Sequence, residues 1–165
     1  MLIHPIKPYG PSREPRNLVS LMQLYDQNYA MLLKLIPALA ADPDQLTVDR
    51  EYRSVIEGDP AVHLVLEERT RYTVVVRLTH YFERTGLKPG EGAGPVADPD
   101  LRVRLFFDAR QAEVLHCGRN YHCDILRQYR GPAHTVLERR WQVNALLHKW
   151  LKHLLERGHR FPVRV

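Results

Sequence analysis

The most regular hydrophobic pattern of the chain lies between residues 136 and 157. Apolar side chains recur there at the 3.6-residue spacing of a helix with one buried face: Val136, Leu137, Trp141, Val143, Leu147, Trp150, Leu151, Leu154 and Leu155. Thr135 and Glu138 form a capping box at its start, and Gly158 supplies the positive φ that commonly ends a helix. The pattern predicts a long amphipathic helix.

A second helical pattern runs from about Asn17, a favoured N-cap, to Leu39. Its apolar face consists of Leu18, Leu21, Met22, Tyr25, Tyr29, Leu32, Leu33 and Ile36. Pro37 lies close to its end, where it can kink or stop the last turn. Residues 1–15 carry prolines at positions 5, 8, 11 and 15, which predict an extended arm. Residues 41–45 are expected to form a loop.

Between the two helices the pattern changes to the alternation that is typical of β-strands. The expected strands are residues 52–56, 62–67, 72–82, 101–107, 112–117 and 121–129. Glu68 to Arg71 predicts a hairpin turn. Residues 84–99 hold four glycines and three prolines without an apolar period, and they predict a long, mobile surface loop.

These elements predict an α+β fold. An antiparallel meander of five or six strands is flanked by an N-terminal and a C-terminal helix, both packed on one face in a two-layer sandwich. The 165 residues fit one domain, so residues 1–165 are expected to fold as a single unit.

The first residues lack the continuous apolar core of a secretory signal. The longest apolar run, residues 29–41, is broken by Lys34 and Pro37, and it is shorter than the roughly 20 residues that span a bilayer. A cytoplasmic location is therefore expected, with Cys117 and Cys123 present as thiols.

Charge is unevenly distributed along the chain. Residues 1–98 carry 11 Lys and Arg against 13 Asp and Glu, whereas residues 99–165 carry 13 against 6, within a net charge of +5. A basic second part is the charge pattern expected of a surface for phosphates or for an acidic partner. The preferred interpretation, however, is that most of these arginines lie on solvated faces.

A polar stripe interrupts the buried face of the last helix. Arg140, Asn144 and His148 follow one another at four-residue spacing, so the stripe either lines a cleft or supplies a buried hydrogen-bond network. In the structural alternative, Asn144 bonds the sheet backbone or Asn28 and ties the layers together. The candidate ligand-binding residues are Asn28, Glu68, Arg71, Tyr72, Arg104, Asp108, Arg140, Asn144 and His148.

Two His-Cys pairs flank one predicted tight turn. Imidazole and thiolate are preferred zinc ligands, so the pairs form a candidate metal site: His116, Cys117, His122 and Cys123. Successive strand residues point to opposite faces, however, so at most two of the four can converge, and His134 or His148 would have to complete the site. Ordinary cross-strand pairs are the favoured interpretation, and no metal or other cofactor is expected.

Carboxylates at the hairpin ends raise the alternative of a metal-dependent hydrolase that uses Glu68, Asp108 or Glu113. The favoured interpretation is structural: Asp108 closes a turn, and Glu113 pairs with Arg104 across two strands. No nucleophile–histidine constellation and no phosphate-binding glycine loop stands out, so an enzyme is not expected.

Four segments resemble the YqiB-like proteins, an uncharacterised proteobacterial family of small single-domain proteins. They are LYDQNY at residues 24–29, ERTRYT at 68–73, VRLFFDARQAEV at 103–114 and QVNALLHKWL at 142–151. The resemblance implies the same fold and matching polar positions: Asn28, Glu68, Thr70, Arg71, Tyr72, Arg104, Asp108, Glu113, Gln142 and Asn144. It carries no activity, and the neighbourhood of the family's genes to nucleotide-hydrolysing enzymes implies a role in nucleotide-related regulation.

The leading hypothesis is a non-enzymatic cytosolic module that binds a partner protein or a small regulatory ligand. The alternative is a protein that binds nucleic acid or nucleotide phosphates through the basic sheet, where arginines are interleaved with aromatic residues. The residues of that alternative are Arg102, Arg104, Phe106, Arg119, Tyr121, Arg127 and Arg130.

Overall fold

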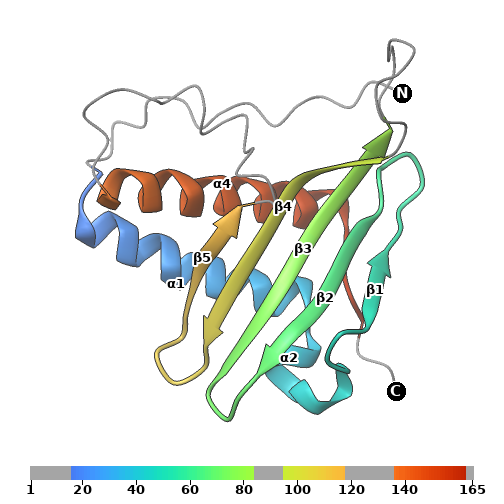
Figure 1. Ribbon diagram of the computed structural model, residues 1–165, viewed down its shortest axis with the longest axis horizontal. Coiled ribbons are helices and arrows are strands. Elements are labelled where there is room, and N and C mark those ends of the chain that lie inside the picture. Colours follow the sequence, from blue (N-terminus) through green and yellow to red (C-terminus); the bar gives the residue numbers. More distant parts are fainter. Residues whose placement is uncertain (1–15, 84–94, 118–135, 163–165) are drawn as a thin grey trace.

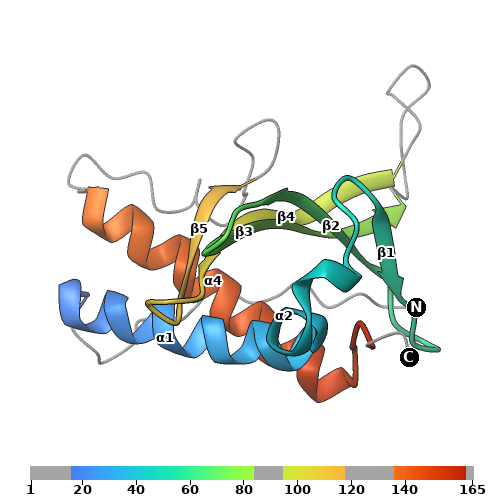
Figure 2. The same ribbon diagram turned by 90° about the horizontal axis from the view of Figure 1, so that it is seen from below.

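The computed structural model describes residues 16–83, 95–117 and 136–162. Within these residues, five strands form one sheet in the order of the chain, and every adjacent pair is antiparallel (Figure 1). They are β1 (Glu51–Ser54), β2 (Val62–Arg69), β3 (Thr73–Glu83), β4 (Pro95–Phe106) and β5 (Gln111–Cys117). The helices lie on one face of this sheet (Figure 2), so the predicted α+β meander of two layers is confirmed. The sixth strand expected at residues 121–129 lies outside the described residues.

Helix α1 (Leu18–Leu35) begins where its cap predicts. The Asn17 side chain accepts a hydrogen bond from the Ser20 N–H at 2.9 Å, and the Ser20 hydroxyl accepts one from the Asn17 N–H at 3.1 Å. The continuous helix expected to Leu39 ends instead at Leu35. Ile36 has φ −124° and ψ 77°, because a residue that precedes proline is disfavoured in the helical region.

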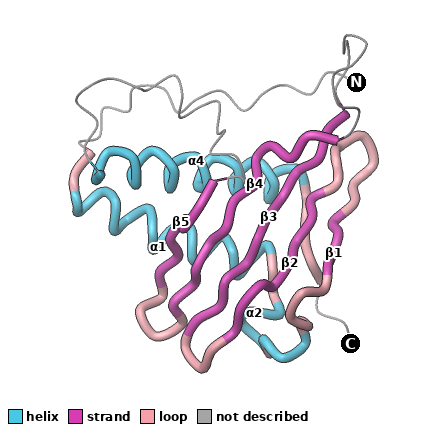
Figure 3. Tube along the Cα trace, viewed as in Figure 1, coloured by secondary structure: helices cyan, strands magenta, loops and turns pink. Residues whose placement is uncertain are grey.

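The chain then forms a short helix and a turn of 3₁₀ helix in place of the expected loop. These are α2 (Ala38–Ala41) and η1 (Pro43–Gln45), and Figure 3 shows them as the connection between α1 and the sheet. The side chain of Asp42 accepts a hydrogen bond from the Asp44 N–H at 3.1 Å, which caps η1. Leu46 is buried directly after it and anchors the connection in the core.

Helix α4 (Val136–Arg157) ends at the predicted glycine. Gly158 has φ +90°, and the N–H groups of Gly158 and His159 donate to the carbonyls of Leu155 and Leu154, as in a Schellman motif. Thr135, the first half of the predicted capping box, lies outside the described residues. Val136 was expected on the buried face but is 70% exposed, because the first turn of α4 extends past β5 (Figure 1).

Strand β4 begins within the segment that the sequence pattern assigned to a loop. Ala97 pairs with Tyr81 and Pro95 with Glu83, so the expected surface loop does not extend to residue 99. Glycine and proline suggested a loop, but Pro99 falls at a register shift in the ladder, where a strand tolerates a residue without an N–H. Residues 84–94 lie outside the described part of the chain.

The main core lies between the sheet and the helices. Fully buried side chains of the sheet pack against α1 and α4: Val62, Leu64, Leu66, Val74, Val76, Leu78, Leu101, Val103 and Leu105 from the strands, and Leu32, Leu35, Leu147, Trp150, Leu151 and Leu154 from the helices. A smaller cluster joins the first halves of the two helices through Leu21, Leu24, Tyr25, Trp141 and Ala145. Within the described residues, no helix has the length and apolar character needed to cross a membrane.

Candidate functional site

The polar stripe of α4 is partly a structural joint. Asn144 is buried, and its Oδ1 accepts a hydrogen bond from the Val114 N–H of β5 at 3.0 Å, while its Nδ2 donates to the carbonyl of Arg140 at 2.8 Å. The buried Asn28 of α1 donates from its Nδ2 to the Asn144 carbonyl at 3.0 Å. These bonds tie α1, α4 and β5 together, as the structural interpretation of the sequence predicted. A ligand-lining role for these residues stays a prediction.

The other members of the stripe lie in different surroundings. Arg140 is exposed and within hydrogen-bonding range of the Tyr25 hydroxyl. Burial raises the pKa of the Tyr25 phenol and the Glu113 carboxylate raises it further, whereas Arg140 opposes both effects. His148 is half-buried, and its Nδ1 is one of the buried polar atoms with no hydrogen-bond partner in the described structure.

Four further candidates lie at the hairpin ends of the sheet, away from the helix joint. Glu68, Arg71 and Tyr72 are exposed at the β2–β3 turn, where the Arg71 guanidinium lies 5.1 Å from the centre of the Tyr72 ring. Asp108 lies in the β4–β5 turn, where its side chain accepts a hydrogen bond from the Ala109 N–H at 2.9 Å. Arg104 lies on the opposite side of the sheet from α4. The nine candidates therefore occupy three separate places and do not line one common pocket.

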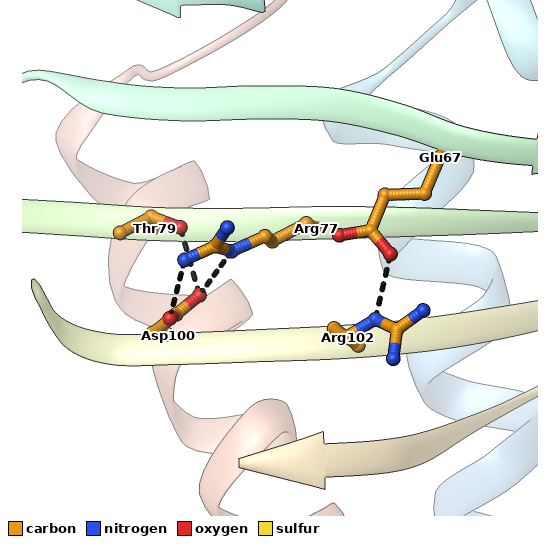
Figure 4. A network of polar contacts seen from close by, with 5 residues as sticks. All are labelled: Glu67, Arg77, Thr79, Asp100 and Arg102. Carbon is orange, nitrogen blue, oxygen red and sulfur yellow. Dashed lines mark hydrogen bonds and ion pairs between the residues drawn. The ribbon is translucent and has the colours of Figure 1, made fainter. Parts of the chain in front are cut away.

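The face of the sheet that no described helix covers is hereafter called the open face. It carries an ordered set of charges contributed by β2, β3 and β4 (Figure 4). Arg77 donates from Nε and Nη2 to the two carboxylate oxygens of Asp100, each at 2.7 Å, and the Thr79 hydroxyl donates to the same carboxylate at 3.0 Å. Arg102 donates from Nε to Glu67 at 2.6 Å. Figure 4 shows the two arginines turned in opposite directions along the sheet, each toward its own carboxylate.

These ion pairs offset a repulsion between two arginines that the strand register places opposite one another. Arg77 and Arg102 are direct partners in the β3–β4 ladder, and like charges opposite one another destabilise a sheet. Asp100 is only 6% exposed, so its bidentate pair with Arg77 is nearly buried, and this hydrogen bond raises the pKa of the Arg77 guanidinium. Arg102 keeps 45% of its side chain exposed. The outer arginine is therefore the one that a partner can reach.

The predicted arginines of β4, Arg102 and Arg104, lie on the open face and are called the arginine row. Other side chains lie directly beside them. Val103 and Leu105 point into the core, so the alternating Arg102, Arg104 and Phe106 point the other way. Arg104 stands opposite Val75 on β3 and opposite Glu113 on β5, and Val75 is only 1% exposed although it faces away from the helices. The remaining residues of the nucleic-acid alternative lie outside the described residues: Arg119, Tyr121, Arg127 and Arg130.

The metal and hydrolase alternatives stay untested in part. His122 and Cys123 lie outside the described residues, and for His116 and Cys117 the structure describes only their backbone in β5. Among the residues that are described, no group of three or more His, Cys, Asp or Glu side chains could hold a metal ion. Glu68 and Asp108 are exposed at different turns, and Glu113 lies on β5.

The sequence pattern did not predict a buried serine–histidine–aspartate arrangement at the β1 edge of the sheet. The Ser54 Oγ lies 3.0 Å from Nδ1 of His159, and Nε2 of His159 lies 2.6 Å from Asp59. Ser54 also accepts a hydrogen bond from the Arg160 N–H at 3.1 Å, and His159 is fully buried. A nucleophile has to reach its substrate, and this serine is enclosed. The arrangement instead fastens the segment after α4 to β1 and to the turn before β2.

Two half-buried histidines, His80 and His148, are expected to make the stability of the fold sensitive to acid. Burial lowers the pKa of His80, against the opposing effects of Asp59 and the Pro60 carbonyl, and burial together with Lys152 lowers the pKa of His148. The unfolded chain therefore takes up protons at a higher pH than the folded one. The free energy of unfolding is expected to fall as the pH drops below about 6.5, the ordinary histidine pKa.

This expectation is checked by denaturant unfolding at about pH 7.5 and about pH 5.5, a window above most carboxylate titration. The variant His80→Phe/His148→Phe should lose much of the difference between the two pH values. His153, which is exposed on α4, provides the control, and His153→Gln should keep that difference. A difference that persists in the double variant would assign the acid sensitivity to other groups.

The described residues define a two-layer α+β protein with charged side chains on the open face of its antiparallel sheet. A family model described as "Protein of unknown function (DUF1249)" matches residues 31–160. The match covers well over half of the chain, so the protein belongs to the DUF1249 family. It includes the whole described sheet, α4 and the Ser54–His159–Asp59 arrangement. No curated protein and no solved structure matches the chain.

Proposed function

We propose that the protein is a non-enzymatic docking module whose binding surface is the open face of the sheet. The observation that carries this proposal is the state of the two arginines on β4. Arg102 is held in place by Glu67 through Nε while 45% of its side chain stays exposed, and Arg104 follows two residues along the same face. The described residues provide no ion pair for Arg104. Two guanidinium groups whose terminal donors have no partner among the described residues favour an anionic contact from outside.

The pattern of charge on this face supports a protein partner over a nucleic acid. Glu67 lies on one side of the arginine row and Glu113 on the other, and Asp100 precedes it on β4. A nucleic-acid strand carries a continuous line of phosphates, which would pass close to these carboxylates. A protein surface can place its acidic groups only where the arginines are. The open face is therefore better matched to a protein partner that carries a few acidic groups.

Two narrower features belong to this proposal. Membership of the YqiB-like group within the DUF1249 family is supported by the four resembling segments, and a cytoplasmic location by the absence of a signal pattern in the first residues. A small nucleotide-related ligand would use the same two guanidinium groups, so it is tested on the same residues.

The proposal is tested with two variants of equal charge change. Arg102→Gln/Arg104→Gln removes the row, and Arg139→Gln/Lys152→Gln removes two exposed cations of α4 as the control. Each protein is immobilised and exposed to cell extract, and the retained proteins are quantified by mass spectrometry. We expect the wild-type protein and the control variant to retain a common set of proteins that the row variant loses, because neutral amides cannot replace charge-assisted hydrogen bonds.

Retention of the same proteins by both variants would contradict the proposal. A short mixed-sequence RNA and common nucleotides are tested with the same three proteins. Salt-sensitive RNA retention that disappears with the row variant would instead support the nucleic-acid alternative. Thermal unfolding of each variant verifies that the fold is intact.

A further inference from the structure

Arg102 has a fixed orientation and a free end. A guanidinium carries five N–H donors, and the Nε donor of Arg102 is engaged by Glu67 at 2.6 Å. The side-on edge that includes Nε is thus occupied. The two terminal nitrogens form an end-on fork, whose parallel N–H groups match the two oxygens of a carboxylate. Glu67 holds this fork in place before any partner arrives, which lowers the entropy lost on binding.

The spacing along β4 defines a second feature of the site. Arg102 and Arg104 are two residues apart on one face of a strand, which separates their Cα atoms by about 6.5 Å. Phe106 follows at the same interval and is half-buried. An extended peptide places alternate side chains at the same repeat. Such a peptide laid along β4 would present one side chain to each of the three positions.

We propose that the open face recognises an extended peptide segment with acidic residues at two alternate positions and an apolar residue at the next. This inference rests on the docking function proposed above and names the partner's chemistry. The two acidic side chains contact Arg102 and Arg104, and the apolar side chain contacts Phe106. The intervening residues of the peptide point away from the sheet, so no negative charge is placed over Glu67 or Glu113.

Two labelled peptides test the spacing. One has the order Leu-Ser-Glu-Ser-Glu-Ser-Leu, which presents the pattern in either direction along β4, and the other has the order Leu-Ser-Ser-Glu-Glu-Ser-Leu with the same composition. Binding to the full chain is measured by fluorescence anisotropy. We expect the alternating peptide to bind about tenfold more tightly, because only one of two adjacent acidic side chains can face the sheet. Equal affinities, or no saturable binding of either peptide, would overturn the inference.

Three substitutions test the fork itself with the alternating peptide. Arg102→Lys keeps the charge but loses the paired donors, and a loss of about tenfold in affinity is expected. Glu67→Gln weakens the contact that holds the fork, and a smaller loss is expected. Arg139→Gln on α4 should leave the affinity unchanged. An Arg102→Lys variant that binds as tightly as the wild type would show that simple charge attraction suffices, and it would overturn the role of the fork.

The peptide experiment and the partner-capture experiment can fail separately. If captured proteins depend on Arg102 and Arg104 while the two peptides bind equally, the open face is a docking surface and the spacing rule is wrong. If capture does not depend on these arginines, the docking function itself fails.

Discussion

Replacing Asn144 by alanine is expected to lower the free energy of unfolding by about 2–3 kcal/mol. The substitution removes the side-chain acceptor of the Val114 N–H, which lies at the joint of β5 with α4. A buried amide left without a hydrogen bond costs about 1–3 kcal/mol, and the lost packing of a buried side chain adds to this. Urea denaturation followed by circular dichroism measures the change.

The variant Asn28→Ala tests whether the Asn28 and Asn144 side chains stabilise the fold independently. Its Nδ2 donates to the backbone carbonyl of Asn144 and not to the side chain, so Asn144→Ala leaves this bond in place. Asn28→Ala should cost about 1 kcal/mol, because its Oδ1 has no described partner and one bond alone is lost. The double variant should then show the sum of the two losses to within about 0.5 kcal/mol.

Gln142 is a matched control, since it carries an amide side chain on the same helix and its Nε2 has no described hydrogen-bond partner. Gln142→Ala should change the free energy of unfolding by less than about 0.5 kcal/mol. An equal loss for Gln142→Ala and Asn144→Ala would show that the bond to β5 contributes little. A coupling of more than about 1 kcal/mol between Asn28 and Asn144 would show that their side chains act as one unit.

Replacing Asp100 by alanine is the other substitution with a large expected effect, about 3 kcal/mol. The change leaves the mostly buried guanidinium of Arg77 without its bidentate partner and the Thr79 hydroxyl without its acceptor. It also leaves Arg77 directly opposite Arg102, without the carboxylate that directs the Arg77 guanidinium away from it. Removing one member of a buried ion pair costs about 3–5 kcal/mol, and the partial exposure of Arg77 places the loss at the lower end. Thermal and urea unfolding both report the loss.

The variant Arg77→Leu/Asp100→Ala distinguishes an unpaired charge from a general defect of packing. Because it removes both charges, its stability should return to within about 1 kcal/mol of the wild-type protein. Glu67→Ala, which breaks the more exposed pair with Arg102, should cost no more than about 1 kcal/mol. If the double variant were as unstable as Asp100→Ala alone, the cause would lie in the shape of the site and not in the charge.

Local signals in the sequence predicted the ends of the helices well. Asn17 caps α1, Gly158 ends α4, and Pro37 stops the first helix near the expected place. Each of these residues acts through its own backbone or through a neighbour within four positions, so a single sequence contains the whole cause. The start of β4 was not predicted, because its cause is not local. Pro95 and Pro99 suggest a loop, whereas pairing with the distant β3 makes this segment a strand.

The candidate site could be predicted only in part. Alternation along β4 correctly placed Arg102, Arg104 and Phe106 on one face, and the stripe on α4 correctly drew attention to Asn144. The partners of these residues depend on strand register: Asp100 pairs with Arg77 across 23 positions, and Glu67 meets Arg102 across 35. Hydrophobic patterning sets which face a residue occupies, but it does not identify the side chain that the residue meets there.

The bonds between the two ends of the fold also set the order of events during synthesis. Three side chains made early bond to residues made much later. Asn28 bonds to Asn144, 116 residues further along the chain, and the Ser20 hydroxyl bonds to the Trp141 indole after 121 residues. Ser54 bonds to His159 after 105 residues. The first half of α1, whose Leu21, Leu24 and Tyr25 pack against α4, therefore keeps this part of its apolar face uncovered until α4 has been made. Contacts of such long sequence separation slow folding and lengthen the time in which apolar surface is open to association. The nascent chain is thus expected to need protection by a chaperone in a way that the finished protein does not.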